Sequence, residues 1–221
     1  MNKFLKLISR LNLKTIYFNF KYLPFKDAIK IPVLISSRVK FKSLKGQILI
    51  NAPISTALIQ IGYETVHIFD HKRSRSIWEV SGTVVFEGKA YIGNGCKISV
   101  SENARLVFGN NFAMTAESSI VAQKEIRFGD DCLLSWDVLV MDTDFHKMLD
   151  EEGKLTNPPE PVIFGSKVWL GCRTLVLKGS VINDGVIVGA NSTVSGKLTV
   201  EHAVYSGMPA RLLKENVRWE R

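Results

Sequence analysis

Between residues 164 and 200, an aliphatic or aromatic residue recurs at every sixth position. A helix would repeat its apolar face every 3.6 residues and a strand every two, so neither alone explains this spacing. A period of six instead predicts a solenoid of short strands and tight corners, in which each rung buries its apolar residues against the rungs before and after it. The anchor residues of this repeat are Phe164, Leu170, Val176, Ile182, Val188, Val194 and Val200.

A second, more compact side chain follows each anchor by four positions, as Val168, Thr174, Ser180, Val186, Ser192, Leu198 and Val204. Cys96 and Cys132 occupy the same position after Ile92 and Phe128. The chain has three cysteines without paired spacing, which argues against a disulfide framework. We therefore expect buried free thiols in a reducing compartment.

The repeat is interrupted once, over residues 146–161, by three prolines, one glycine and four acidic residues. A rung cannot accommodate so many missing amides and buried charges, so this segment must leave the stack as an extended loop. Short β-type runs begin near Val33, and clear rungs begin at Tyr91. We therefore place the solenoid domain at residues 36–207, with the loop inside it.

The two termini fall outside this pattern. Residues 1–35 form a basic N-terminal segment, in which apolar residues at helical spacing over residues 3–20 predict a short helix. Residues 208–221 are expected to form a basic C-terminal tail.

The positive charge of the chain lies at its N-terminus. The net charge is +8, and residues 1–45 hold eleven lysines and arginines against one aspartate. No apolar run approaches the roughly 20 residues of a spanning helix, and no cleavage site for a signal peptide follows. Basic residues interleaved with apolar ones suit an anionic membrane surface, but also a helix packed on the solenoid or on another subunit. No nucleic-acid-binding motif accompanies the charge.

Among the four histidines, only His146 stands where a regular rung meets the extended loop. Asp144 follows the anchor-type residue Val140 by four positions, where other rungs carry a compact side chain. Such a departure from the local rule is typical of a functional site. Histidine is suited to act as a general base, because its pKa is close to neutral.

Three segments, residues 142–146, 168–171 and 207–211, follow in an order that resembles the galactoside, maltose and xenobiotic O-acetyltransferases. The similarity is stronger still to the O-acetyltransferases that modify surface polysaccharides, and it covers about residues 90–214. These are hexapeptide-repeat enzymes. The resemblance therefore implies an all-β fold, a left-handed parallel β-helix with a short N-terminal helical segment, one extended loop and a C-terminal tail.

The resemblance also implies roles for individual residues. His146 corresponds to the general base, with Asp144 beside it as a second catalytic residue. Thr115 stands where relatives with small acceptors have an asparagine, and with Glu117 and Asp142 it would bind the acceptor substrate. Acetyl-CoA, the co-substrate, would lie between two subunits of a homotrimer. Its contacts would come from Trp169, Cys172, Ala190, Ser195, Gly196, Arg211 and Lys214, and no metal is implied.

The function expected from these observations is transfer of acetyl from acetyl-CoA to a saccharide hydroxyl during surface polysaccharide biosynthesis. The expected location is the cytoplasm, and peripheral contact with the inner membrane face is the alternative that the basic N-terminus leaves open. Two alternatives stay open, an N-acetyltransferase for an amino sugar and a non-catalytic hexapeptide scaffold. A hexapeptide carbonic anhydrase would need three histidines to hold zinc, a set that the regular coils do not offer.

Overall fold

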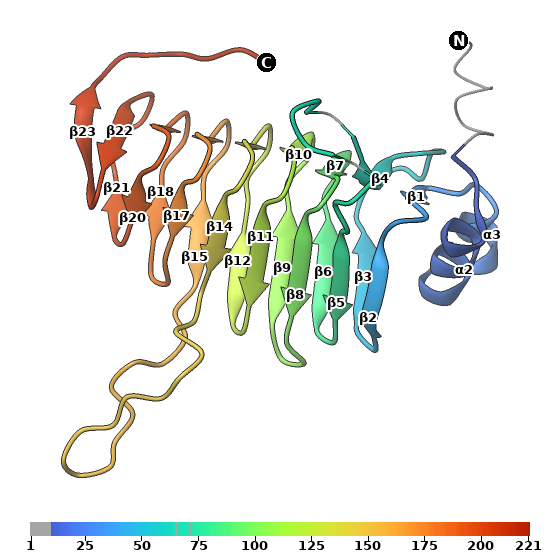
Figure 1. Ribbon diagram of the computed structural model, residues 1–221, viewed down its shortest axis with the longest axis horizontal. Coiled ribbons are helices and arrows are strands. Elements are labelled where there is room, and N and C mark those ends of the chain that lie inside the picture. Colours follow the sequence, from blue (N-terminus) through green and yellow to red (C-terminus); the bar gives the residue numbers. More distant parts are fainter. Residues whose placement is uncertain (1–9, 65, 71) are drawn as a thin grey trace.

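Short parallel strands wind into a column of three sheets in the computed structural model, which describes residues 10–64, 66–70 and 72–221 (Figure 1). Sheet A contains, in spatial order, β1 (Val33–Ile35), β4 (Ile59–Tyr63), β7 (Ala90–Gly93), β10 (Phe112–Met114), β13 (Leu133–Leu134), β16 (Trp169–Leu170), β19 (Ile187–Val188), β22 (Val204–Gly207) and β23 (Ala210–Lys214). Sheet B contains β2 (Lys40–Leu44), β5 (Ile77–Val80), β8 (Lys97–Val100), β11 (Ser119–Ala122), β14 (Leu139–Met141), β17 (Leu175–Val176) and β20 (Thr193–Val194). Sheet C contains β3 (Gln47–Ile50), β6 (Thr83–Phe86), β9 (Arg105–Phe108), β12 (Glu125–Arg127), β15 (Val162–Phe164), β18 (Val181–Ile182) and β21 (Lys197–Leu198).

Each coil takes one strand from each sheet, so consecutive coils stack strand on strand. In the late coils the period is three times six, because Leu170 pairs with Val188, which lies 18 positions later. In the earlier coils Ile92 pairs with Met114, 22 positions later. These longer coils explain why the six-residue pattern is irregular before residue 164.

The interior of the column is filled by the anchor side chains, which stack from coil to coil. A ladder of aromatic rings runs along one side of it, with centroids 5.2 Å apart between Phe86 and Phe108 and 5.9 Å between Phe108 and Phe128. The ladder ends at Phe164, 4.4 Å from Phe128. Offset stacking of this kind adds about 1 kcal/mol per pair to the burial of each ring.

The last anchor predicted from the sequence is wrong. Leu198, not Val200, pairs with Ile182 in sheet C and is buried, while Val200 lies between β21 and β22 and is only partly buried. The final coil is therefore two residues shorter at this point than the repeat requires. The segment expected to be a tail begins with β23, which turns back antiparallel on β22.

The N-terminal end of the column is covered by helix α2 (Leu13–Tyr22) and the short helix α3 (Phe25–Ala28). The hydroxyl of Thr15 donates to the carbonyl of Ile35, and the amide of Asn19 donates to the carbonyl of Val33. These bonds protect the open edge strand of sheet A, β1, from pairing with another chain. A helix is confirmed for residues 13–20, but the prediction is wrong for residues 10–12, because Asn12 is the extended N-cap at which the helix begins. The earlier part of the prediction, residues 3–9, lies outside the described residues.

No helix in the described part of the chain has the length and apolar character needed to cross a membrane.

Candidate active site

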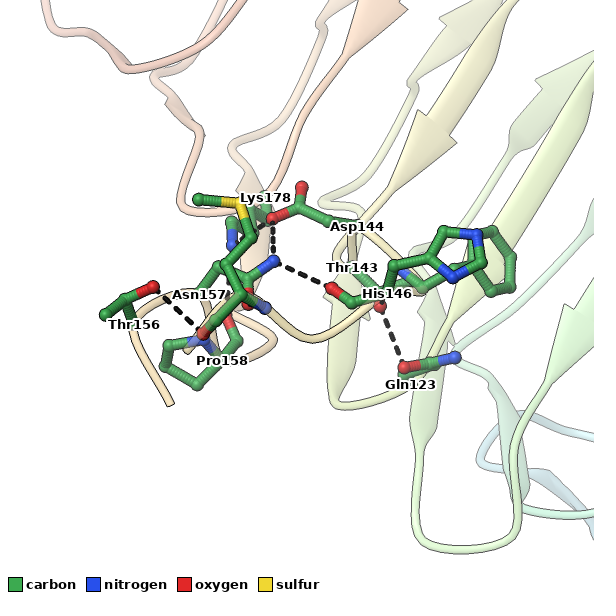
Figure 2. Close-up of polar contacts among 10 residues, drawn as sticks. Gln123, Thr143, Asp144, His146, Thr156, Asn157, Pro158 and Lys178 are labelled. Carbon is green, nitrogen blue, oxygen red and sulfur yellow. Dashed lines mark hydrogen bonds and ion pairs between the residues drawn. The ribbon is translucent and has the colours of Figure 1, made fainter. Parts of the chain in front are cut away.

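His146 lies where the chain leaves sheet B to form the extended loop, which spans residues 142–161 between β14 and β15. Its imidazole is exposed and points away from Asp144 and Lys178 (Figure 2). Within the described residues, this ring forms no hydrogen bond or ion pair. Both ring nitrogens are therefore available to a group from outside the chain.

The turn that presents His146 is strained and firmly held. Phe145 has a φ of 61°, a left-handed conformation that a bulky residue rarely adopts. The buried hydroxyl of Thr143 accepts a hydrogen bond from the Phe145 N–H (3.0 Å) and donates to Oε1 of Gln123 in the preceding coil (2.8 Å). Strain of this kind persists only where the surroundings enforce it, and it is concentrated at functional sites.

Asp144 points to the other side of the turn, where its carboxylate forms an ion pair with Lys178 (Figure 2). It also accepts a hydrogen bond from Nδ2 of Asn157 at 2.9 Å. Hydrogen bonds from Lys178 and Asn157 lower the pKa of the Asp144 carboxyl below its usual value. The pair is therefore intact at neutral pH and is lost only as the pH falls through this lowered pKa.

Asn157 connects the two sides of the loop. Its amide nitrogen donates to the carbonyl of His146 (2.9 Å) as well as to Asp144, and its Oδ1 accepts from the N–H of Met148 (2.7 Å). Asp144, Asn157 and Lys178 thus fix the backbone on which His146 stands. The Asp144 carboxylate does not contact the imidazole.

Asp142 was expected among the substrate-binding residues, and the structure corrects this. Its side chain is fully buried, and its carboxylate accepts hydrogen bonds from the backbone N–H groups of Gln123 (2.7 Å) and Lys124 (2.8 Å). A carboxylate with no exposed surface has nothing to offer a substrate. Its role is to join the start of the loop to the coil before it.

The other predicted site residues occupy two different edges of the column. We call the segments from sheet A to sheet B the A–B corners; they hold Thr115, Glu117, Cys172 and Ala190. We call the segments from sheet B to sheet C the B–C corners; they hold His146, Ser195 and Gly196, together with Lys178. One chain therefore does not bring the predicted acceptor-binding residues to the predicted base.

Trp169 lies in β16 of sheet A, half-buried, with its Nε1 donating to the hydroxyl of Ser135 at 3.1 Å. The ring of Trp219 lies 5.9 Å from it, between centroids. Arg211 and Lys214 are exposed and are the second and the last residue of strand β23. Glu117 is ion-paired to Lys97 at 3.1 Å.

The last residues of the chain run back along the third edge of the column (Figure 1). This edge is formed by the segments that connect a strand of sheet C to the next strand of sheet A. The Nε1 of Trp219 donates to the carbonyl of Lys167 at 2.7 Å. The guanidinium of Arg221 donates to the carbonyls of Asn111 and Cys132. At Asn111, Cys132 and Lys167 this edge is thus covered by the chain itself.

Sequence analysis missed four residues that support the site or contact its predicted residues: Gln123, Asn157, Lys178 and Trp219. The position of Lys178 could have been predicted from the repeat. The anchors Val140 and Val176 pair in adjacent coils, so Lys178, two positions after Val176, must lie close to the start of the loop at Asp142. For the other three the sequence held no such signal, because their contacts depend on side chains of different coils or of the loop.

The cysteines behave as expected from their positions. All three are free, and Cys96 and Cys132 are buried. Burial raises the pKa of both thiols to about 12, so neither is reactive at neutral pH. Among residues 10–64, 66–70 and 72–221, no three His, Cys, Asp or Glu side chains gather closely enough to hold a metal ion.

No protein-family model matches the chain. A putative lipopolysaccharide biosynthesis O-acetyl transferase, WbbJ of Escherichia coli K12, is 28% identical over 154 residues, covering 63% of this chain and 78% of that protein. The polysialic acid O-acetyltransferase of Neisseria meningitidis is 32% identical over 162 residues, covering 59% of this chain and 74% of the relative.

Two solved structures share the fold. The polySia-specific acetyltransferase NeuO superposes with a TM-score of 0.59 at 20% identity, covering 86% of this chain and 75% of that one. The polysialic acid O-acetyltransferase OatWY superposes with a TM-score of 0.53 at 22% identity, covering 86% and 90%. With its three stacked parallel sheets, the chain is a left-handed parallel β-helix and belongs to the hexapeptide-repeat O-acetyltransferases.

Proposed function

We propose that the enzyme transfers the acetyl group of acetyl-CoA to a hydroxyl of a saccharide in surface polysaccharide biosynthesis. The observation that carries this proposal is the exposed imidazole of His146. Within the described residues the ring has no hydrogen-bond partner, and it stands on a strained turn that is held by hydrogen bonds. The relatives support the acceptor class, since their names assign them to lipopolysaccharide and polysialic acid. We place the reaction in the cytoplasm, where acetyl-CoA is available.

In the proposed mechanism, the imidazole of His146 removes the proton of the acceptor hydroxyl as its oxygen attacks the thioester carbonyl carbon. General-base catalysis of this kind contributes about 10²–10⁴-fold. Backbone N–H groups at the corners are suited to stabilise the oxyanion of the tetrahedral intermediate. When this intermediate collapses, the C–S bond breaks and the imidazolium returns the proton to the thiolate of CoA. Asp144 acts here as a positioning residue, through Lys178 and Asn157.

We propose that the enzyme is a homotrimer with its active sites between subunits. The A–B corners and B–C corners lie on different edges of one chain, which supports a site in which the corners of one chain face those of another. One subunit would contribute His146, Ser195 and Gly196. Its neighbour would contribute the acceptor-binding Thr115 and Glu117, and the acetyl-CoA contacts Trp169, Cys172, Ala190, Arg211 and Lys214, whose two cations suit phosphates.

The acetyl transfer is tested by incubating the enzyme with acetyl-CoA and a panel of saccharides, and measuring free CoA together with the mass and linkage of the product. We expect a saccharide that gains one acetyl group as an alkali-labile ester. The panel includes amino sugars and oligosialic acid. An alkali-stable amide as the main product, or CoA release with no modified saccharide, would contradict the proposal.

The shared site is tested by light scattering and by mixing two inactive variants. Light scattering should give three times the monomer mass. His146→Ala removes the base from the B–C corner, and Cys172→Trp fills the A–B corner with a large ring. Each should be inactive alone, but trimers co-assembled from both should recover activity at roughly a quarter of their interfaces, where two intact corners meet.

Two controls accompany this experiment. Each variant must elute as a trimer with the circular dichroism of the wild type, and wild-type chains mixed with His146→Ala chains give the activity expected from dilution. Co-assembled trimers as inactive as their parents would show that each chain carries a complete site.

A further inference from the structure

Helix α2 is buried on one face and carries exposed apolar side chains on the opposite face. One face, with Phe18, packs against β1 and the ring of Trp78, 5.5 Å away between centroids. The opposite face consists of Leu13, Ile16, Tyr17 and Phe20, with exposed fractions of 84%, 45%, 53% and 44%. Large apolar side chains gathered on the solvent side of a helix reverse the usual pattern, in which the apolar face of a surface helix is the covered one.

Helix α3 extends this exposed surface. The ring of Phe25 lies 5.9 Å from that of Phe20, and Phe25 and Ile29 are 72% and 54% exposed. We call this surface the end patch, made of Leu13, Ile16, Tyr17, Phe20, Phe25 and Ile29. Figure 1 shows both helices at the end of the column opposite β22 and β23. Large exposed apolar patches of this kind mark sites of interaction.

A basic hollow lies beside the end patch, on the A–B corners of the first two coils. Lys14 connects the two surfaces, because it belongs to α2 and its Nζ donates to the carbonyls of Ser37 and Val39 in the hollow. In the described segment 10–45, nine lysines and arginines stand against Asp27 alone. The cations that line the hollow are Lys14, Arg38, Lys40, Lys72, Arg73 and Arg75.

We propose that this end of the column docks on an anionic lipid bilayer. The end patch would enter the boundary between headgroups and acyl chains, and the basic hollow would lie over lipid phosphates. Charge complementarity favours an anionic bilayer over other partners. The apolar end patch matches the acyl chains, and the cations of the hollow match the phosphates of the headgroups. The inference goes beyond acetyl transfer and does not depend on it.

Sedimentation with lipid vesicles tests the docking. Vesicles of phosphatidylcholine are compared with vesicles containing roughly a third phosphatidylglycerol, at low and at high salt. We expect the full chain to sediment with the anionic vesicles at low salt, to be released in part by salt, and to remain in solution with the neutral vesicles. No sedimentation with anionic vesicles at low salt would overturn the proposal.

Two pairs of substitutions separate the contributions of the apolar and charged surfaces. Leu13→Ser with Phe25→Ser removes exposed apolar area, and Lys72→Glu with Arg75→Glu reverses the charge of the hollow. We expect each pair to weaken binding to anionic vesicles by about tenfold or more. The matched controls, Leu149→Ser at the extended loop and Lys89→Glu with Lys154→Glu, should bind as the wild type does.

The same variants identify other occupants of the end patch. If Leu13→Ser with Phe25→Ser lowers the oligomer mass in light scattering and leaves vesicle binding unchanged, the patch is a contact between subunits and the proposal fails. If the two control substitutions weaken binding as much as the charge reversal in the hollow, attraction is general and the docking surface is wrong. Acetyl transfer to a water-soluble acceptor, measured in parallel, should be unchanged in all end-patch variants.

Discussion

His146→Ala is expected to lower kcat by about 10²-fold or more, with little change in the affinity for acetyl-CoA. The imidazole is the side chain available to remove a proton at the junction of rung and loop, because Asp144 is bound to Lys178 and Asn157. The side chain is exposed and makes no internal hydrogen bond within the described residues, so its removal should not disturb folding.

The measurement is the steady-state rate of CoA release with the saccharide identified in the acceptor panel. His67→Ala is a matched control, since this imidazole is also exposed and lies far along the chain from the loop. Added imidazole should restore part of the activity of His146→Ala.

Near-normal turnover of the His146→Ala variant would place the base on another residue. Loss of activity without rescue by imidazole, together with an altered unfolding transition, would show that the residue is structural.

Asp142→Ala is expected to destabilise the fold by about 3 kcal/mol, because it removes a buried carboxylate that accepts two backbone hydrogen bonds. The carboxylate of Asp142 is the acceptor for Gln123 N–H and Lys124 N–H, and it is fully buried. Asp142→Asn retains one acceptor oxygen and should lose about half as much. The loop begins at this residue, so kcat should fall as well.

The stability is measured by urea unfolding, followed by far-UV circular dichroism at one protein concentration, since association adds to the apparent stability. Asp144→Ala, two residues away and exposed, is the control and should unfold close to the wild type. An unfolding midpoint of Asp142→Ala equal to that of Asp144→Ala would show that the buried hydrogen bonds do not stabilise the fold.

The periodic positions could be predicted from the sequence because each anchor depends only on its neighbours in the stack. Phe164, Leu170 and Val188 are buried in strands as the spacing requires. Val200 was predicted wrongly because the prediction used only this local spacing. A change in coil length leaves the local pattern intact, and only the pairing of Leu198 with Ile182 reveals it.

The site could be predicted only in part. His146 could be singled out because it lies where a rung meets the loop. The edge that a residue occupies could not be predicted from a six-residue period, because coils before the loop have 20 or 22 residues instead of 18. Thr115 and His146 were therefore placed in one site without the knowledge that they lie on different edges. The burial of Asp142 was equally hidden, because its partners are backbone groups of another coil.

The N-terminal helix shows a different limit. Helical spacing of apolar residues predicts that the apolar face is buried, but the apolar face of α2 is exposed and its buried face combines Phe18 with two polar residues. Which face meets the column depends on Thr15 and Asn19, whose side chains bond to the edge of β1.

The extended loop leaves the column and returns to it at almost the same place. The N–H of Glu160 donates to the carbonyl of Asp142 at 3.0 Å, and Ile126 pairs with Val162 beyond the loop as it would beyond an ordinary corner. The exposed tip of the loop, residues 149–156, can therefore change in length without repacking the interior. Loops from relatives could be grafted between Met148 and Asn157, which would change the tip of the loop and leave His146 and its supporting residues in place.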